Sequence, residues 1–246
     1  MNPFIPMKFA NTVIVDGRID EEIEGNLNKL GLKVIKTIKC SDVYESIQYH
    51  PDIVIHPVNH HTLVIAPNVF DYYEDKLKNM GINLIKGDKF LGSKYPDDIA
   101  YNVGRLSRIA IHNFKYTDEV LKYYLKKENI EFVNVNQGYA KCSLAIVDEN
   151  SCITSDYPMF KKLKSLGFNV LLIQPGHILL EGQKYGFIGG TNGSLSNNQS
   201  IISGSLNNHP NKNEIIRFFD ENNVELIYLS NKNLLDIGTF IALYCH

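Results

Sequence analysis

The sequence predicts a single α/β domain: a propeller of five pseudo-symmetric units, with strands around a central axis and helices outside. First, a short apolar strand pattern recurs five times. Second, each copy is followed by a helical pattern and then by another short strand. Third, 246 residues divided among five units give about 49 residues per unit, a period typical of propeller-like arrays. A doubly wound sheet also alternates strands and helices, but it does not need a further strand in every unit.

The first strand of each unit is an apolar run followed by a turn rich in Asn, Asp or Gly. These runs cover residues 12–16, 63–67, 108–112, 144–148 and 185–189. They place the unit boundaries at about 12–63, 64–108, 109–144, 145–185 and 186–246 within one domain, 1–246.

A helix and a second strand follow in each unit. Apolar residues at helical spacing, with capping residues and closing glycines, predict helices over 20–30, 71–80, 118–127, 157–166 and 213–222. The second strands are expected at 33–35, 83–85, 131–133, 169–173 and 225–228, and a further strand at 200–202.

Composition and charge exclude several classes of function. With a net charge of −2, the chain has no general basic field that would recruit nucleic acid or an anionic membrane. Its apolar runs are too short to cross a bilayer, and its N-terminus does not read as a signal peptide. We therefore expect a cytoplasmic protein with neither a nucleic-acid nor a membrane partner.

The cysteine and histidine spacings predict no metal site, no cofactor and no disulfide framework. Cys40, Cys142, Cys152 and Cys245 lie far apart, without a CxxC pair, as expected of reduced thiols. The rings of the adjacent His60 and His61 point to opposite faces of a strand, which disfavours a joint metal site.

A polar residue near a glycine precedes the outgoing strand of four units. These motifs are Asn102-Val103-Gly104, Asn136-Gln137-Gly138, Glu181-Gly182 and Asp236-Ile237-Gly238. In a closed ring they would point to the axis and line a polar pocket, whereas the alternative is that they only mark turns. Glu181 and Asp236 each interrupt an apolar run, which favours a ligand site or a salt bridge to Arg105 or Lys141.

Five such units with polar residues at the axis resemble the pentein fold of guanidino-group-modifying enzymes, which include arginine deiminases, dimethylargininases and amidinotransferases. The best local match, residues 138–149, is similar to the third-unit segment of dimethylargininases. The chain also resembles an uncharacterised clostridial-type family of this fold with a degenerate catalytic triad.

The resemblance implies a thiolate nucleophile, a histidine acid–base and carboxylates that hold a guanidinium group. Where the nucleophile is expected, this chain has Thr239 after Asp236-Ile237-Gly238, and where the histidine is expected it has residues 138–141. The leading hypothesis is therefore a protein that binds a small polar or guanidino-type ligand in an axial pocket, with the usual Cys/His machinery missing.

Two alternatives stay open. The protein is an active hydrolase or amidinotransferase for C–N bonds of guanidino or amidine compounds, using Cys142 or Cys245. Alternatively, it is a non-enzymatic pentein with a protein or ribosomal partner, as other penteins bind the large ribosomal subunit.

The candidate catalytic residues are Cys142, which lies beside an axis motif, and His177, which precedes Glu181 by an even offset along an extended strand. The glycine-rich stretch 189–193 lacks the Lys-Ser/Thr of a phosphate loop, but it allows close approach to the axis. The candidate ligand-binding residues are Asn11 (on the resemblance), Asn102, Arg105, Asn136, Lys141, Glu181, Gly190, Asn192, Asp236 and Thr239.

Overall fold

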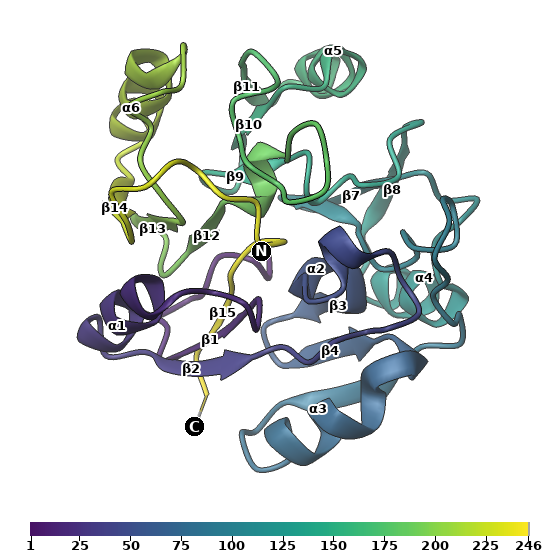
Figure 1. The fold of residues 1–246 in the computed structure, drawn as a ribbon. Helices are drawn as coiled ribbons and strands as arrows, with labels where there is room; N and C mark the ends of the chain where they lie inside the picture. The colour runs from purple at the N-terminus through teal and green to yellow at the C-terminus, as the bar shows by residue number, and fades with distance from the viewer. Residues whose placement is uncertain (246) are drawn as a thin grey trace.

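Five small sheets surround a common axis in the computed structural model, which describes residues 1–245. Each sheet has three strands, and the longer helices lie on the outside of the ring (Figure 1). The predicted five-unit α/β propeller is confirmed.

Four of the sheets come from continuous stretches of chain and share one plan. Their strands are β3 (Ile55–Asn59), β4 (Thr62–Ile65) and β5 (Asn83–Lys86); β6 (Gly104–Leu106), β7 (Ile109–His112) and β8 (Glu131–Asn134); β9 (Ala145–Ile146), β10 (Ser151–Thr154) and β11 (Asn169–Leu172); and β12 (Asn192–Ser194), β13 (Gln199–Ile202) and β14 (Glu225–Tyr228). The middle strand pairs antiparallel with the strand before it and parallel with the strand after it. A parallel neighbour needs a crossover, and a helix supplies it each time.

The fifth sheet joins the two ends of the chain and closes the ring. β1 (Thr12–Val15) pairs parallel with β2 (Lys33–Lys36) and antiparallel with β15 (Ile241–Leu243). Thr12 faces Leu243 and Ile14 faces Ile241, so the chain runs outward from the axis as it enters β15. The continuous sheets thus span residues 55–86, 104–134, 145–172 and 192–228. Of the predicted unit ranges, 145–185 begins at the first strand of its sheet, whereas 64–108 and 109–144 begin at or beside a middle strand.

The crossover helices are amphipathic and pack their apolar face on the sheets. They are α1 (Glu21–Lys29), α3 (Phe70–Leu77), α4 (Glu119–Lys127), α5 (Tyr157–Ser165) and α6 (Lys212–Glu221). The carboxylates of Asp20, Asp118 and Asp156 cap three of them by accepting a backbone N–H of the first turn. The five predicted helices are confirmed to within three residues at each end.

Three short helical turns join the strands elsewhere, at η1 (Glu45–Ile47), η2 (Pro67–Val69) and η3 (Ile188–Gly190). The four-residue helix α2 (Pro51–Val54) differs from the outer helices because it lies inside the ring (Figure 1). It brings polar side chains to the axis.

Two predicted strands need correction. The run 185–189 is not a strand, because the Phe187 N–H donates to the Asp236 carboxylate and the chain enters η3; the strand follows as β12. The run 144–148 supplies only the outer strand β9, and the middle strand of that sheet is β10.

The apolar core lies between the sheets and the outer helices, while the axis collects buried polar groups. Four clusters of buried apolar side chains fill the space around the ring. The polar side chains at the axis, which we call the hub, are those of Asp16, His50, Asp52, Asn102, Lys141, Cys142, Asp236 and Thr239, each no more than 3% exposed. None of the helices in residues 1–245 is both long and apolar enough for a membrane span.

Candidate functional site

Asn102 ties the hub together. Its side-chain Nδ2 donates to the Asp52 carbonyl at 3.2 Å and contacts Cys142 Sγ at 3.1 Å. Its Oδ1 accepts the backbone N–H groups of Lys141 at 2.9 Å and Cys142 at 3.2 Å. A single fully buried amide therefore fixes the segment 141–142 against helix α2.

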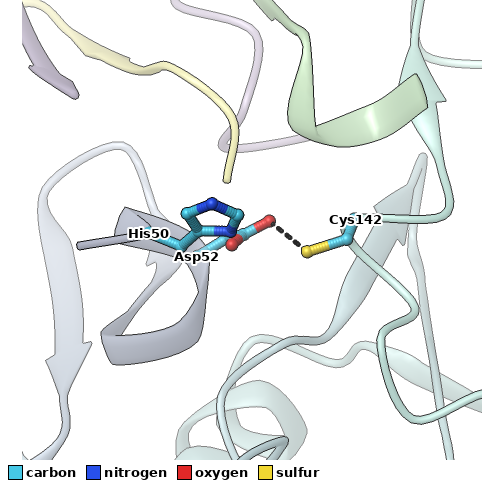
Figure 2. A group of neighbouring side chains, drawn as sticks. All are labelled: His50, Asp52 and Cys142. Carbon is cyan, nitrogen blue, oxygen red and sulfur yellow. Dashed lines mark hydrogen bonds between the residues drawn. The ribbon is translucent and has the colours of Figure 1, made fainter. Parts of the chain in front are cut away.

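Cys142 and Asp52 form the central contact of the hub. The thiol donates to Asp52 Oδ2 at 3.0 Å, and the two side chains approach each other from opposite sides (Figure 2). Burial raises the pKa of Asp52 to about 6, and burial together with the nearby Asp52 carboxyl raises the pKa of Cys142 well above its usual value. The sulfur is therefore a protonated thiol in this arrangement.

His50 lies beside this pair and is fully buried. Its Nε2 is 3.8 Å from Asp16 Oδ2 and its Nδ1 is 3.9 Å from Asp236 Oδ1. Within residues 1–245 neither ring nitrogen has a hydrogen-bond partner, and neither does Asp52 Oδ1. An orphaned buried polar atom costs about 1–3 kcal/mol, so these three atoms mark a place that is incomplete without a ligand or water.

Lys141 and Thr239 occupy the other side of the hub. The Lys141 ammonium donates to the Gly189 carbonyl and to Thr239 Oγ1, both at 2.9 Å, and lies over the Phe4 ring. Burial lowers the pKa of Lys141. Thr239 has φ of +73°, a strained region for a β-branched residue, and its hydroxyl donates to the Asn192 carbonyl at 2.8 Å.

A cavity of about 120 Å³ opens at one end of the hub, and we call it the mouth. Its polar lining consists of Asp16, Arg18, Glu181 and Asp236. Arg18 donates to both oxygens of Asp16, at 3.0 and 2.7 Å, and to the Ser46 carbonyl at 3.0 Å. Three carboxylates against one guanidinium leave the mouth with a net charge of −2.

The other end of the hub is nearly closed. A cavity of only about 10 Å³ remains beside Lys141, Asn192 and Thr239, under Phe4 of the N-terminal segment. That space holds one water at most. Any ligand larger than water would therefore reach the hub through the mouth.

Most of the residues singled out from the sequence meet in this region. Asn102, Lys141, Cys142, Asp236 and Thr239 belong to the hub. Gly190 packs so closely on Asp236 that a Cβ there would overlap the carboxylate. Asn192 lines the closed end and Glu181 lines the mouth.

Other predicted residues lie elsewhere. Asn136 is exposed in an outer groove of about 490 Å³, and the exposed His177 stacks edge-on against His209. Both ends of the Asn11 amide bond the Cys245 backbone, which places Cys245 at the opposite end of β1 from Asp16. Arg105 is fully buried, donates to the Val58 carbonyl, and has its pKa lowered to about 10 by burial.

His50, Asp52 and Arg18 were not singled out from the sequence. Asp52 carries a weaker form of the signal seen at Asp236, because it is a charge directly before an apolar run, Ile53-Val54-Ile55, rather than inside one. That signal could have been found. Arg18 gave none, because a surface arginine and a pocket arginine look alike in sequence.

Comparisons with solved structures define the fold class of the protein. Three of the structures that share its fold across nearly the whole chain serve as examples. Inosamine-phosphate amidinotransferase from Streptomyces griseus has a TM-score of 0.59 at 11% identity and covers 96% of this chain and 94% of its own. DDAH from Pseudomonas aeruginosa, solved with citrulline, has a TM-score of 0.55 at 9% identity, and the match covers 91% of this chain and 93% of that protein. Agmatine deiminase from C. jejuni has a TM-score of 0.54 at 12% identity, and the match covers 94% of this chain and 91% of that protein. The chain thus has the pentein fold of guanidino-modifying enzymes.

The family itself follows from the sequence. The model of the Family of unknown function (DUF6873) matches residues 14–241, so the chain belongs to that family. A search of curated proteins found no match.

Proposed function

We propose that the protein binds a small cation carrying a guanidinium or amidinium group at the mouth of the hub. The observation that carries this proposal is the charge of the mouth, where Asp16, Glu181 and Asp236 face one cavity with Arg18 as their single cation among the lining residues. A negative cavity with low-dielectric walls concentrates cations. Paired carboxylate oxygens are the natural acceptors of a guanidinium group.

Arg18 illustrates the type of binding within the chain. Its guanidinium is held by both Asp16 oxygens, by a backbone carbonyl and by the face of Tyr49, whose ring centre is 5.1 Å away. A free ligand would use the remaining carboxylates. Asp236 accepts one backbone N–H on each oxygen and keeps a lone pair on each, and the exposed Glu181 is free to turn inward.

The size of the mouth fits the head group. About 120 Å³ accommodates several waters, and a guanidinium group has four heavy atoms. The aliphatic tail of an agmatine- or arginine-like ligand would then extend into solvent.

The hub supports binding over the thiolate chemistry of the fold's enzymes. Cys142 is a buried thiol that donates to Asp52, and burial raises its pKa rather than lowering it. A thiolate nucleophile needs the opposite environment.

Isothermal titration calorimetry with agmatine, arginine and guanidine, against neutral urea as the matched ligand, tests the proposal. We expect the cations to bind and urea not to bind. Glu181→Gln and Asp236→Asn should each weaken binding by about tenfold, the value of one charge-assisted hydrogen bond. Glu131→Gln, a neutralised carboxylate on an outer strand, is the control and should bind normally. Equal heats for all variants, or no heat with any cation, would refute the proposal.

A further inference from the structure

We propose that His50, Asp52 and Cys142 form a binding site for a divalent transition metal ion of the Zn²⁺ type in the hub. Each side chain offers one ligand atom, and the three atoms lie within 4.8 Å of one another (Figure 2). His50 and Asp52 are close neighbours in sequence, whereas Cys142 lies 90 positions beyond Asp52 and reaches them only through the folding of the ring.

Three possible metal-ligand atoms of this site have no hydrogen-bond partner within residues 1–245. Both ring nitrogens of the fully buried His50 and the Oδ1 atom of Asp52 lack a hydrogen-bond partner in the described chain, residues 1–245. A bound cation would give one nitrogen and the carboxylate oxygen a partner. This is an observation independent of the clustering itself.

The donor set selects the ion. One imidazole nitrogen, one carboxylate oxygen and one thiolate sulfur suit Zn²⁺, whereas Mg²⁺ and Ca²⁺ prefer oxygen ligands alone. Zinc bonds of about 2.0–2.3 Å place tetrahedral ligands roughly 3.5 Å apart, so ligand atoms that lie up to 4.8 Å apart need to close by up to about 1.3 Å. Three protein ligands leave a fourth position open.

The groups around His50 match those found beside metal-bound histidines. A ligating histidine usually donates its second N–H to a carboxylate or a carbonyl, which fixes the ring. Here Asp16 stands 3.8 Å from Nε2 and Asp236 stands 3.9 Å from Nδ1, so whichever nitrogen binds the ion, the other faces a carboxylate. Asn102 Nδ2, 3.1 Å from Cys142 Sγ, can likewise donate to a thiolate.

The charges of the hub accommodate the ion despite Lys141. That ammonium is held by the Gly189 carbonyl and Thr239 Oγ1, on the other side of the hub. The charges of Arg18 and Asp16 cancel in their ion pair. The remaining charged groups of the hub, Asp52, Asp236 and Lys141, together carry −1. Adding a divalent cation and losing the thiol proton of Cys142 brings the hub to zero. A buried site is most stable when its charges are balanced in this way.

The metal site does not rest on the proposed ligand, because none of the three metal ligands His50, Asp52 and Cys142 lines the mouth. Zn²⁺ does not absorb visible light, so Co²⁺ serves as the probe ion. Its absorption spectrum reports a tetrahedral environment and a thiolate ligand in separate bands. The chelator-treated full chain is incubated with increasing Co²⁺, and then with Zn²⁺ in competition.

We expect one equivalent of Co²⁺ to bind with a near-ultraviolet thiolate-to-cobalt band and with visible tetrahedral bands. Zn²⁺ should displace it. Cys142→Ser should abolish the thiolate band, and Asp52→Asn should weaken binding by about 10-fold or more, the loss that even outer partners of a metal cause. Cys152→Ser removes another fully buried thiol, outside the hub, and should change neither band.

Circular dichroism of each variant shows whether it folds, and Asp52→Asn carries the test if Cys142→Ser does not. No cobalt band in the wild type, a thiolate band that survives Cys142→Ser, or unchanged affinity in Asp52→Asn would each overturn the proposal. These outcomes do not depend on whether agmatine binds.

Discussion

Replacing Asn102 by alanine should be among the most destabilising single changes in the hub. The side chain is fully buried and makes four contacts, to the Asp52 carbonyl, Cys142 Sγ and the backbone N–H groups of Lys141 and Cys142. The Lys141 N–H has a second acceptor in the Asn102 carbonyl, which the substitution keeps. The Cys142 N–H and the Asp52 carbonyl lose the partner described above.

Two orphaned buried groups at about 1–3 kcal/mol each give a loss of roughly 2–6 kcal/mol in the free energy of unfolding. For a chain of this size that corresponds to a fall in Tm of about 4–24 °C, at 2–4 °C per kcal/mol. Urea denaturation followed by circular dichroism measures it. Asn136→Ala is the matched control, because Asn136 belongs to the same sequence motif but is exposed; it should change stability by no more than about 0.5 kcal/mol. Equal losses for the two variants would refute the assignment of Asn102 to the hub.

Three further predictions follow from other parts of the structure. Burial lowers the pKa of His112 to about 4, so the unfolded chain takes up a proton before the folded chain does as the pH falls below 6.5, and the free energy of unfolding decreases. His112→Asn should remove up to about 1.4 kcal/mol per pH unit of this decrease between pH 6.5 and 4.5. Urea denaturation measures the slope, and an unchanged slope would contradict the prediction. Gly190→Ala forces a Cβ onto the Asp236 carboxylate and should lower stability by about 1–3 kcal/mol in the same assay, unlike Gly25→Ala, where a Cβ meets open space. His177→Ala should leave cation affinity within about twofold by calorimetry, because the side chain is exposed against His209; a much larger loss would move the binding site there.

The architecture was predictable because each unit repeats the same local signals. The outer helices and their parallel strands are marked by apolar spacing, capping aspartates and closing glycines, which act within a few residues. The strand expected at 185–189 failed for a non-local reason. There the Phe187 N–H is taken by Asp236, a residue 49 positions away, rather than by a neighbouring strand.

The hub was only half predictable for the same reason. Asn102 and Asn136 occur in equivalent motifs, but one is buried and the other exposed, and the direction of a turn side chain depends on how the sheet before it meets the axis. His50 and Asp52 reach the hub because α2 turns into the ring, which no periodicity in residues 51–54 indicates. Besides the polar motif near a glycine, a charge inside an apolar run was a second sequence signal for this region, at Glu181 and Asp236. Asp52 shows only a weaker form of it, because it directly precedes the apolar run Ile53-Val54-Ile55.

The two proposed sites share their counter-charges, and this makes their occupancies interdependent. Asp16 and Asp236 line the mouth and also face the ring of His50, so a metal ion in the hub and a guanidinium at the mouth would be attracted by the same carboxylates. Each cation reduces the negative charge that holds the other. By linkage the two affinities must fall by the same factor, about fivefold or more if the coupling has the usual size. Calorimetry of agmatine with and without one equivalent of Zn²⁺, and of Zn²⁺ with and without saturating agmatine, measures both directions. Tighter agmatine binding to the zinc-loaded protein would show that the carboxylates are not shared and that the ion lies elsewhere.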